Sequence, residues 1–590
     1  KSANQPADQT AMGNGGNAAA KEQHVKCNAG VHQCLFPMYL VKVSDFLQME
    51  GVPEAHHSMK QQGLLHEWQP GMFVIFISHQ WLGTKSPDPL GQQLSVLRHT
   101  LAAFINGSTQ VEADLMRTFG DPKETTSYEQ VADGYLFLDW FAIPQITARS
   151  DGVNDDITQS DAARAVQSIP AYVEQSDMFV ALVPELLHAD TGLRCNYTTW
   201  LSRGWCRAEL WCRLLSNRRD TRVIVVFSAR EALYILPSDW QRNLISDGMF
   251  TVESDRAVVE KLGEVALNSK IQCLQVLGPS VDYRFYLAYQ DKLLNQTKQS
   301  CQDLPSFLHH FHFPSIEAAV KHESGMTGML CAILGGDVEI LQTLVQHHGD
   351  VNARVSGLAH LGFGDTHSLL MVAAASAQDA KMLQTLMMLH ADPNVACISD
   401  SGSIVTASWL ASHPSHVHVL LEKRADFAMS PPLTGVAGTA STETVQAFLE
   451  VRCDPTTVSE NGWGPMYSTP FFGRGSPHST STMELLLSLR CDPNMQAIPR
   501  GLLYWECLRS RISASIWGLE NCGVYQRQMA SLPGATPLSI AAVMGDKALV
   551  EVLLEHDAQQ IPNDRGDTPE DLARAACHMD LLPILSVFSV

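Results

Sequence analysis

The side chain most able to do chemistry in this chain is the carboxylate of Glu209, which lies on a short apolar helix. Residues 203–215 read RGWCRAELWCRLL, and at about 100° per residue they place apolar side chains almost all the way around that helix. A helix of this kind is usually buried, so a carboxylate on it needs a partner or a purpose. Arg213 follows one turn later and offers an ordinary ion pair. The pattern leaves two alternatives open, a paired structural carboxylate and a carboxylate poised to react.

Polar and aromatic side chains follow two apolar runs that predict buried strands, at residues 73–78 and 135–139. Ligands of an open parallel sheet bind beyond the carboxyl ends of its strands. Glu209, near the start of a later helix, should lie at the same edge. Aromatic rings there would enclose a flat ligand, although such rings pack the bases of loops at least as often. The predicted ligand-binding residues are Ser78, His79, Trp81, Asp139 and Trp140.

Strand and helix patterns alternate from about residue 70 to residue 265. Alternation of this kind indicates a parallel sheet covered by helices on both faces. Beyond the two runs above, strands are expected at 178–183, 223–227 and 248–252, and helices at 90–104, 162–175 (interrupted near Pro170) and 255–267.

A loose repeat runs from about residue 316 to residue 590. Six helices with one apolar pattern are each followed by a turn that carries an aspartate, at intervals of 42, 34, 28, 38 and 65 residues. Such spacing scatters around the period near 33 of paired-helix repeats, with an insertion at 495–533. An aspartate in a tight turn accepts backbone hydrogen bonds, which accounts for it without a catalytic role. The six are Asp350, Asp392, Asp426, Asp454, Asp492 and Asp557.

Composition narrows the class of function. The formal net charge of −21, with no basic block, argues against nucleic acid or an anionic membrane as the main partner. No run of 18 apolar residues predicts a membrane span. The 14 cysteines are scattered singly and predict reduced thiols in the cytoplasm. The densest histidine group, at 309–312, lacks a second ligand pair, so no metal site is expected.

The remaining segments complete the expected organisation of a chain of 590 residues, which is too long for one ordinary core. Residues 1–24, rich in Ala, Gly, Asn and Gln, predict a disordered tail. Residues 25–69 are expected to form an N-terminal extension of the α/β domain at 70–265. Residues 266–315 predict a helical linker to the repeats at 316–590.

The domain at 70–265 resembles a Toll/interleukin-1 receptor (TIR) domain. The order of its elements and the Trp-Cys-x-x-Glu-Leu motif at 205–210 are similar to that family. The resemblance covers about a third of the chain and implies a flavodoxin-like parallel sheet. Many members assemble with other TIR domains in signalling, and others cleave NAD at the nicotinamide–ribose bond with a glutamate in the helix that Glu209 occupies here. The resemblance therefore implies a catalytic Glu209, NAD as a substrate with no cofactor required, and self-association of the domain.

The repeats resemble ankyrin repeats, most closely in their last two units. The sequence TPL at 536–538, with AA at 541–542 and GD at 545–546, is close to the ankyrin consensus, and GDTP at 566–569 opens a terminal unit. The resemblance implies an all-α solenoid that binds other proteins. Two functions follow. One is an intracellular protein-interaction and signalling scaffold. The alternative is an NAD glycohydrolase that the ankyrin array targets or restrains.

Overall fold

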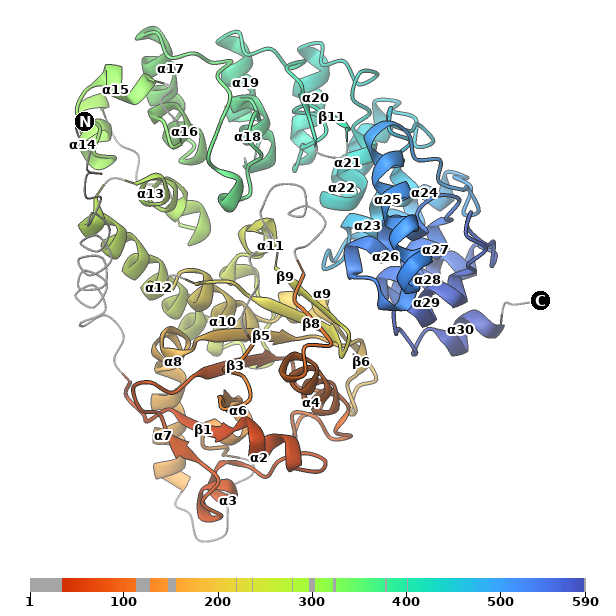
Figure 1. Ribbon diagram of the computed structural model, residues 1–590. Coiled ribbons are helices and arrows are strands. Elements are labelled where there is room, and N and C mark those ends of the chain that lie inside the picture. The colour runs from red at the N-terminus through yellow and green to blue at the C-terminus, as the bar shows by residue number, and fades with distance from the viewer. Residues whose placement is uncertain are drawn as a thin grey trace, which may run out of the picture.

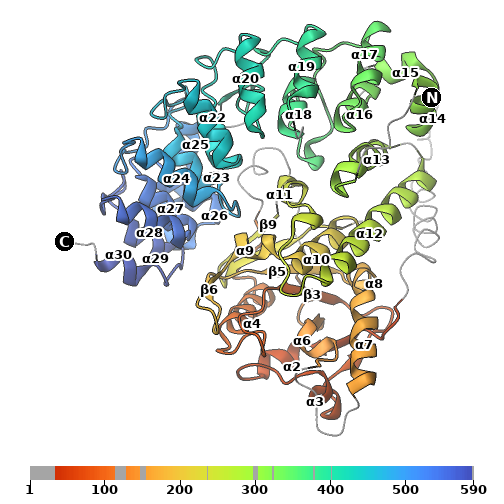
Figure 2. The same ribbon diagram turned by 180° about the vertical axis from the view of Figure 1, so that it is seen from behind.

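The computed structural model of the chain describes residues 34–112, 128–146, 155–218, 220–235, 237–278, 280–296, 303–321, 325–376, 379–399 and 402–587. An α/β domain built on a central sheet is joined through helices to a curved array of helix pairs (Figure 1). The array arches over the α/β domain, as the view from behind also shows (Figure 2). The disordered tail predicted at 1–24 lies outside the described residues.

Seven strands form the central sheet in the order β2-β1-β4-β3-β5-β8-β9. The core of the sheet is parallel, since β3 pairs with β4 and β5, and β5 pairs with β8. Every residue of β3 and β5 is buried, and because side chains alternate between the two faces of a strand, both faces are covered. The strands are β1 (Tyr39–Lys42), β2 (His66–Glu67), β3 (Val74–His79), β4 (Tyr135–Phe137), β5 (Met178–Leu182), β8 (Ile224–Ser228) and β9 (Glu231–Tyr234).

The edges of the sheet differ from the sequence-based expectation. Residues 25–69 are expected only as an extension, but β1 and β2 from this segment pair antiparallel into the sheet next to β4. The strand predicted at 248–252 is wrong, because Met249 makes only an isolated bridge to Arg203. The strand β9, antiparallel to β8, forms the edge of the sheet next to β8. Short edge strands depend on pairing with distant residues more than on an apolar run of their own.

The helices of the α/β domain pack around this sheet. α10 packs against α8 and β3, and α4 packs against β8. The predicted interruption near Pro170 is confirmed, since α7 ends at Gln167 and α8 begins at Ile169 with the proline in its first turn. The helices are α2 (Val43–Gln48), α3 (His56–Gln61), α4 (Gln92–Ile105), α6 (Asp139–Ala142), α7 (Asp155–Gln167), α8 (Ile169–Gln175), α9 (Tyr197–Ser202), α10 (Gly204–Leu214) and α11 (Pro237–Arg242).

Helices also connect the two halves. α12 (Asp255–Leu277) packs against α10, and α13 (Val281–Leu293) packs against both α12 and the first array helix, α16 (Gly328–Leu334). α14 (Leu304–His310) and α15 (Ile316–Val320) follow before the array begins. This segment therefore braces the start of the array against the α/β domain.

The array is a stack of short helices in pairs, and the six predicted apolar helices are all present, as α17, α19, α20, α22, α24 and α28. The motif at 536–546 forms α27 because Thr536 caps its start, Pro537 takes the first helical position and Gly545 ends it in the left-handed conformation. The helices are α17 (Val338–Gln346), α18 (Leu369–Ser376), α19 (Lys381–Met388), α20 (Pro414–Glu422), α21 (Leu433–Thr439), α22 (Thr442–Glu450), α23 (Pro465–Phe472), α24 (Ser479–Ser488), α27 (Pro537–Met544), α28 (Lys547–Glu555), α29 (Pro569–Ala575) and α30 (Leu582–Val587). The insertion predicted at 495–533 holds a further helix pair, α25 (Gly501–Trp517) and α26 (Val524–Ser531).

The turns of the array use their aspartates as predicted, with one exception. Five of them accept a hydrogen bond from the backbone N–H two residues later, at 2.8–3.0 Å. Asp557 instead takes a left-handed conformation (φ 62°), as Arg490 does two residues before Asp492 in the preceding turn. Sequence spacing therefore places Asp557 two residues out of register with the other five, which are Asp350, Asp392, Asp426, Asp454 and Asp492.

Asparagine side chains in these turns join neighbouring units. Asn394 donates to the carbonyl of Arg424 at 3.2 Å and accepts from the N–H of Asp426 at 2.7 Å. Asn352 and Asn494 make the same pair of bonds to the unit that follows each of them. Contacts between adjacent units are typical of repeat proteins, whose stability is a sum over neighbours.

Both ends of the array contact the rest of the chain. Near its start, Gln241 of α11 donates to the carbonyl of Leu361 at 2.8 Å. Near its end, the carboxylate of Glu231 on β9 lies 2.5 Å from the Arg474 guanidinium and 3.4 Å from the His578 ring. The array is therefore held against the α/β domain at two separated places (Figure 1).

Candidate functional site

Glu209 lies at the carboxyl end of β3, where the sequence places it. Helix α10 packs against β3, and its first residue, Gly204, lets it start directly against the 248–250 segment, because a Cβ on this residue would clash with the Phe250 ring. Ser78 donates to the Glu209 carboxyl at 2.5 Å, and the indole of Trp200 donates to the same Ser78 oxygen at 3.1 Å. A strand end, a helix and a buried tryptophan therefore fix the Glu209 side chain.

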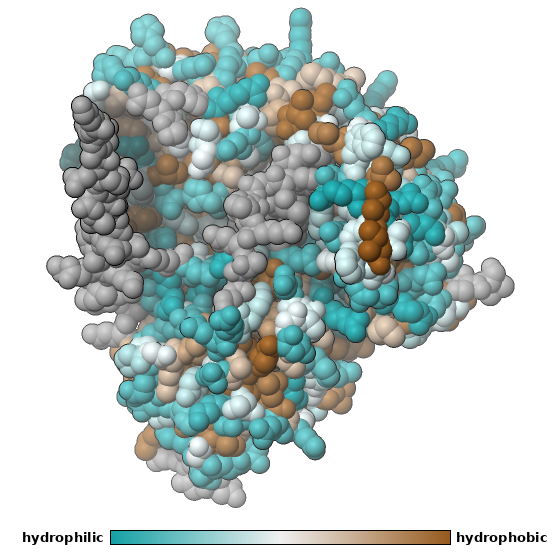
Figure 3. Space-filling model, viewed as in Figure 1, coloured by the Kyte–Doolittle hydropathy of each residue, from teal (hydrophilic) through white to brown (hydrophobic). Residues whose placement is uncertain are grey.

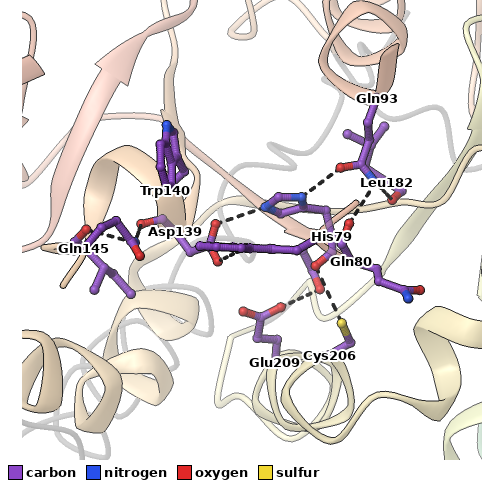
Figure 4. A network of polar contacts seen from close by, with 12 residues as sticks. His79, Gln80, Gln93, Asp139, Trp140, Gln145, Leu182, Cys206 and Glu209 are labelled. Atoms are coloured by element: carbon purple, nitrogen blue, oxygen red, sulfur yellow. Dashed lines mark hydrogen bonds and ion pairs between the residues drawn. The ribbon is translucent and has the colours of Figure 1, made fainter. Parts of the chain in front are cut away.

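His79, Trp81 and Asp139 form a second group beside Glu209. The His79 ring bonds through Nε2 to Asp139 at 3.0 Å and through Nδ1 to the side-chain oxygen of Gln93 at 2.9 Å. Trp81 donates to the other oxygen of Asp139 at 2.8 Å. Figure 4 shows the His79 ring between Gln93 and Asp139, with Glu209 on the α10 side. Four residues predicted from two strand ends thus meet Glu209 at one edge of the sheet.

Trp140, the fifth predicted residue, has a packing role. Its indole donates to the carbonyl of Pro53 at 2.8 Å, and the residue is only 6% exposed. The Trp81 and Trp140 rings contact each other at 5.7 Å and 80°. This edge-to-face geometry is a packing contact, and the two rings do not face each other across a gap.

The ion pair between Glu209 and Arg213 does not form, and both residues belong to the described part of the chain. The Arg213 guanidinium is buried and donates to the carbonyls of Ser176, Asp177 and Arg222 at 2.9–3.3 Å. These carbonyls lie around the start of β5 and before β8, while Ser78 is near the end of β3. The structural alternative for Glu209 is therefore a hydrogen bond to Ser78, without a cationic partner from its own helix.

Burial controls the protonation of Glu209. It raises the pKa of this carboxyl to about 8, against the opposing effect of the Ser78 hydrogen bond, and the negative charge of Asp139 raises it further. At neutral pH the Glu209 side chain is therefore mostly a neutral acid. A cation brought next to it would favour the carboxylate and lower this pKa.

His79 and Asp139 ionise as a pair. Burial alone would lower the pKa of His79, but the charge and hydrogen bond of Asp139 outweigh it and raise that pKa. Burial likewise opposes ionisation of Asp139, yet His79 and Trp81 hold its pKa below the ordinary value. The site thus places an ion pair beside a neutral carboxylic acid, and this arrangement separates proton donor and acceptor roles.

Several residues of the site are missed by sequence reasoning. Gln93 lies on α4 and also donates to the Gln80 carbonyl at 3.3 Å, so it joins the helix to the loop after β3. Thr199 donates to the Gln80 side chain at 2.7 Å. Gln93 could have been found from the sequence, because a glutamine among the apolar residues of one helix face indicates a buried polar contact. The Thr199 contact could not, because it depends on the course of a distant loop.

The loop after β5 forms the rim of the site and reaches the array. Its Ala189 N–H donates to the Leu82 carbonyl at 2.7 Å, which joins it to the loop after β3. It contains a small hairpin of β6 (Leu186–Leu187) and β7 (Arg194–Cys195). Arg194 pairs there with Glu551 of α28 as well as with Glu185 at 3.5 Å. One arginine therefore connects the rim to the array.

Two further features are absent from the described residues. Among them, no group of three or more His, Cys, Asp or Glu side chains is arranged to hold a metal ion. In the same ranges, no helix combines the length and apolar character required to cross a membrane.

Comparison with known proteins adds little. No protein-family model and no curated protein matches the chain. Among solved structures, the ankyrin repeat domain of Bcl-3, described as a unique member of the IkappaB protein family, matches 44% of this chain and 100% of its own. The sequence identity is 21% and the TM-score is 0.28, a score too low to show a shared fold. The description of the array as stacked helix pairs rests on its own helices.

Proposed function

We propose that this protein is a cytoplasmic protein-interaction and signalling scaffold in which an ankyrin-like array holds a TIR-like domain. The parallel strands β3, β4, β5 and β8, numbered among themselves, have the order 2-1-3-4, which is typical of flavodoxin-like sheets. The paired helices and the capped motif at 536–546 support the ankyrin-like interpretation. All twelve cysteines in the described residues are free thiols, which fits a reducing compartment.

The observation that carries this proposal is the buried contact of Glu231 with the array. The Glu231 side chain is 4% exposed and that of Arg474 is 16% exposed. Burial opposes ionisation of Glu231, but the charges of Arg474 and His578 hold its pKa below the ordinary value. Breaking a buried pair leaves an uncompensated charge, whereas the intact pair adds little net stability. Such a contact fixes one position of the array against the α/β domain, and a competing partner protein could still separate the two.

Reversing one charge of this contact tests the proposal. Arg474→Glu should open the chain, which small-angle scattering would detect as a larger radius of gyration and amide exchange as faster exchange in β9. The freed α/β domain should then associate more strongly as concentration rises. Arg164→Glu, at a 52% exposed arginine on α7, is the control and should change neither property. If the Arg474→Glu protein keeps the wild-type radius of gyration and the wild-type self-association, the array does not restrain the α/β domain and the proposal is contradicted.

We propose NAD glycohydrolase activity as the second candidate, because Glu209 has no cationic partner from its own helix and contacts Ser78 at the end of β3. β3 lies between β4 and β5, where the strand order of the sheet reverses. Ligands of doubly wound sheets bind at such a point, beyond the carboxyl ends of the strands. The TIR-like motif around Glu209 supports NAD as the substrate class.

The chemistry required of Glu209 is electrostatic. Cleavage of the nicotinamide–ribose bond sends its electron pair to the departing neutral nicotinamide and leaves positive charge on the ribose, to which water then adds with loss of a proton. A carboxylate beside the ribose stabilises that charge. The positive pyridinium ring of the bound substrate would favour ionisation of Glu209, and Ser78 would hold the carboxylate through its hydrogen bond.

Free nicotinamide measured after incubation with NAD tests this candidate. Turnover should be lost in Glu209→Gln and reduced in Ser78→Ala. Glu174→Gln is the matched control, since Glu174 is also a partly buried carboxyl of raised pKa in this domain but binds the N–H of Asn217. Because the carboxylate is the active form, turnover at limiting NAD should rise with pH, reach half its maximum near pH 8 and level off above that pH. No release by the intact chain or by the opened Arg474→Glu variant would refute the enzyme.

A further inference from the structure

Helix α25, in the insertion, presents apolar side chains to solvent at a regular spacing. The residues of this stripe follow each other at steps of four, three, four, three and four. Within α25 such steps keep side chains on one face of the helix, as in the core positions of a coiled coil. Figure 3 shows a narrow hydrophobic strip in the region that α25 occupies in Figure 1. We call these residues the α25 stripe: Leu502, Trp505, Arg509, Ile512 and Ile516 on α25, and Ile498 in the segment just before the helix.

The opposite face of α25 already has a partner. Leu503, Cys507, Ser510 and Ala514 are buried, and α26 packs against this helix. By contrast, Trp505 is 64% exposed. A helix that is apolar on two opposite sides is suited to the middle of a packed layer, with a second helix on its outer side. The α25 stripe therefore has the pattern of an interface whose other half lies outside the described residues of this chain.

The exposed area fits a pair of chains. The five apolar residues of the stripe are 55–66% exposed, so they present on the order of 500 Å² of apolar surface. Two such surfaces together bury on the order of 1,000 Å², which reaches the size of specific protein interfaces. The stripe alone is as large as the largest apolar patch of many monomers.

The steps of three, four and three from Leu502 to Ile512 are the same in both directions along α25, which favours a second copy. When two copies lie antiparallel with the symmetry axis at Cys507, Leu502 of one faces Ile512 of the other. Trp505 of one copy faces Arg509 of the other, and a guanidinium over an indole ring is a favourable contact. A parallel pair would instead bring the two Arg509 cations together. Symmetric oligomers commonly use such self-complementary surfaces.

We propose that the α25 stripe is a homodimer interface in which α25 packs antiparallel against α25 of a second copy. Arg509 sits in the stripe as the one charged residue, 67% exposed on its side chain and paired with Glu506 at 2.7 Å. Across the dimer it gains the Trp505 ring of the other chain. It also opposes any parallel or shifted pairing that would align two arginines, so it fixes the register.

Light scattering on the full chain over a micromolar concentration series tests the interface. The wild-type chain should show twice the mass of a single chain, and Ile512→Glu or Trp505→Glu should each weaken the dimer at least tenfold. Val276→Glu, at a 75% exposed valine on α12, is the control for an added charge and should leave the dimer unchanged. Unchanged circular dichroism of each variant shows that α25 remains folded.

Cysteine pairs test the orientation. Under mild oxidation, the Leu502→Cys, Ile512→Cys double variant should cross-link two chains, and neither single variant should do so above the level of the wild-type thiols. A single variant that cross-links efficiently would show a parallel pair and overturn the antiparallel dimer. If the wild-type protein has the mass of a monomer at all concentrations, the homodimer proposal is wrong. This outcome includes the case in which the α25 stripe binds a helix of a different protein. Dimerisation through α25 does not depend on Glu231, so Arg474→Glu should leave it intact.

Discussion

Replacing Glu209 with glutamine should remove a pH dependence from the stability of the folded chain. The glutamine side chain has nearly the same shape and still bonds Ser78, but it cannot ionise. In the native protein the Glu209 carboxyl has a pKa of about 8, raised by burial, against an ordinary value of 4.5. Between these two values the unfolded chain releases the proton and the folded chain keeps it, so the free energy of unfolding falls as pH rises.

The magnitude follows from the two pKa values. A full proton difference between the folded and unfolded states changes the free energy of unfolding by about 1.4 kcal/mol per pH unit. At pH 7 the cost of keeping Glu209 protonated is therefore about 3 kcal/mol, and above pH 8 it reaches about 4 to 5 kcal/mol. Below the ordinary pKa the cost disappears. Glu209→Gln removes this cost, so the variant should gain about 3 kcal/mol on the wild-type chain between pH 5 and pH 7.

Urea unfolding of both proteins at a series of pH values measures this difference. Seven tryptophans (68, 81, 140, 200, 205, 211 and 240) lie in the α/β half, so their fluorescence reports mainly on this domain. Subtracting the two free energies at each pH cancels every other titrating group that the substitution leaves alone. A difference that does not change from pH 5 to pH 8 would show that Glu209 is ionised in the folded protein, and the reasoning from burial would be wrong.

Three further substitutions test the contacts that hold the fold. Arg474→Ala should leave the buried Glu231 carboxylate with only the His578 ring beside it and destabilise the contact between the array and the α/β domain by about 3 to 5 kcal/mol. Proteolysis near β9 should become faster, and an unchanged rate would show that the arginine is dispensable. Gly204→Ala should drive a methyl group into the Phe250 ring and cost about 1 to 3 kcal/mol, which thermal melts would show and Phe250→Ala should partly restore. Asn394→Ala removes two hydrogen bonds between neighbouring units and should cost about 1 to 3 kcal/mol in chemical denaturation; a neutral result would mean that the turns are held by packing alone.

The sequence predicts the parts of the fold that depend on local pattern. Continuous apolar runs identify β3, β5 and β8, because strands buried on both faces need no polar alternation. Topology then brings Ser78 and Asp139 to one edge, since parallel strands end on the same side. β1, β2 and β9 are missed because each is short and is defined by its partner strand. The strand predicted at 248–252 fails for a related reason: an apolar segment can cover a helix start as well as join a sheet.

The partners of charged side chains are harder to predict than their positions. Arg213 is one turn from Glu209, but its guanidinium bonds three backbone carbonyls, two of which lie 36 and 37 residues earlier in the sequence. Buried backbone carbonyls need hydrogen-bond donors as much as carboxylates need cations. Helix spacing alone does not show whether an arginine bonds such carbonyls or a carboxylate on its own helix. Glu231 illustrates the same point, since both of its partners, the Arg474 guanidinium and the His578 ring, come from the array, more than 200 residues later.

The contacts of Arg194 give the array a physical route to the site. This arginine binds Glu551 of the array and Glu185 of the rim loop, and the same loop is joined through Ala189 to Leu82 in the loop after β3. Burial raises the pKa of Glu185 to about 7, so its charge changes in the physiological range. A partner that pulls α28 away would leave Arg194 and Glu185 to rearrange, and the loop that follows His79 would lose a support. Release of the array and a change at the Glu209 site are therefore expected together.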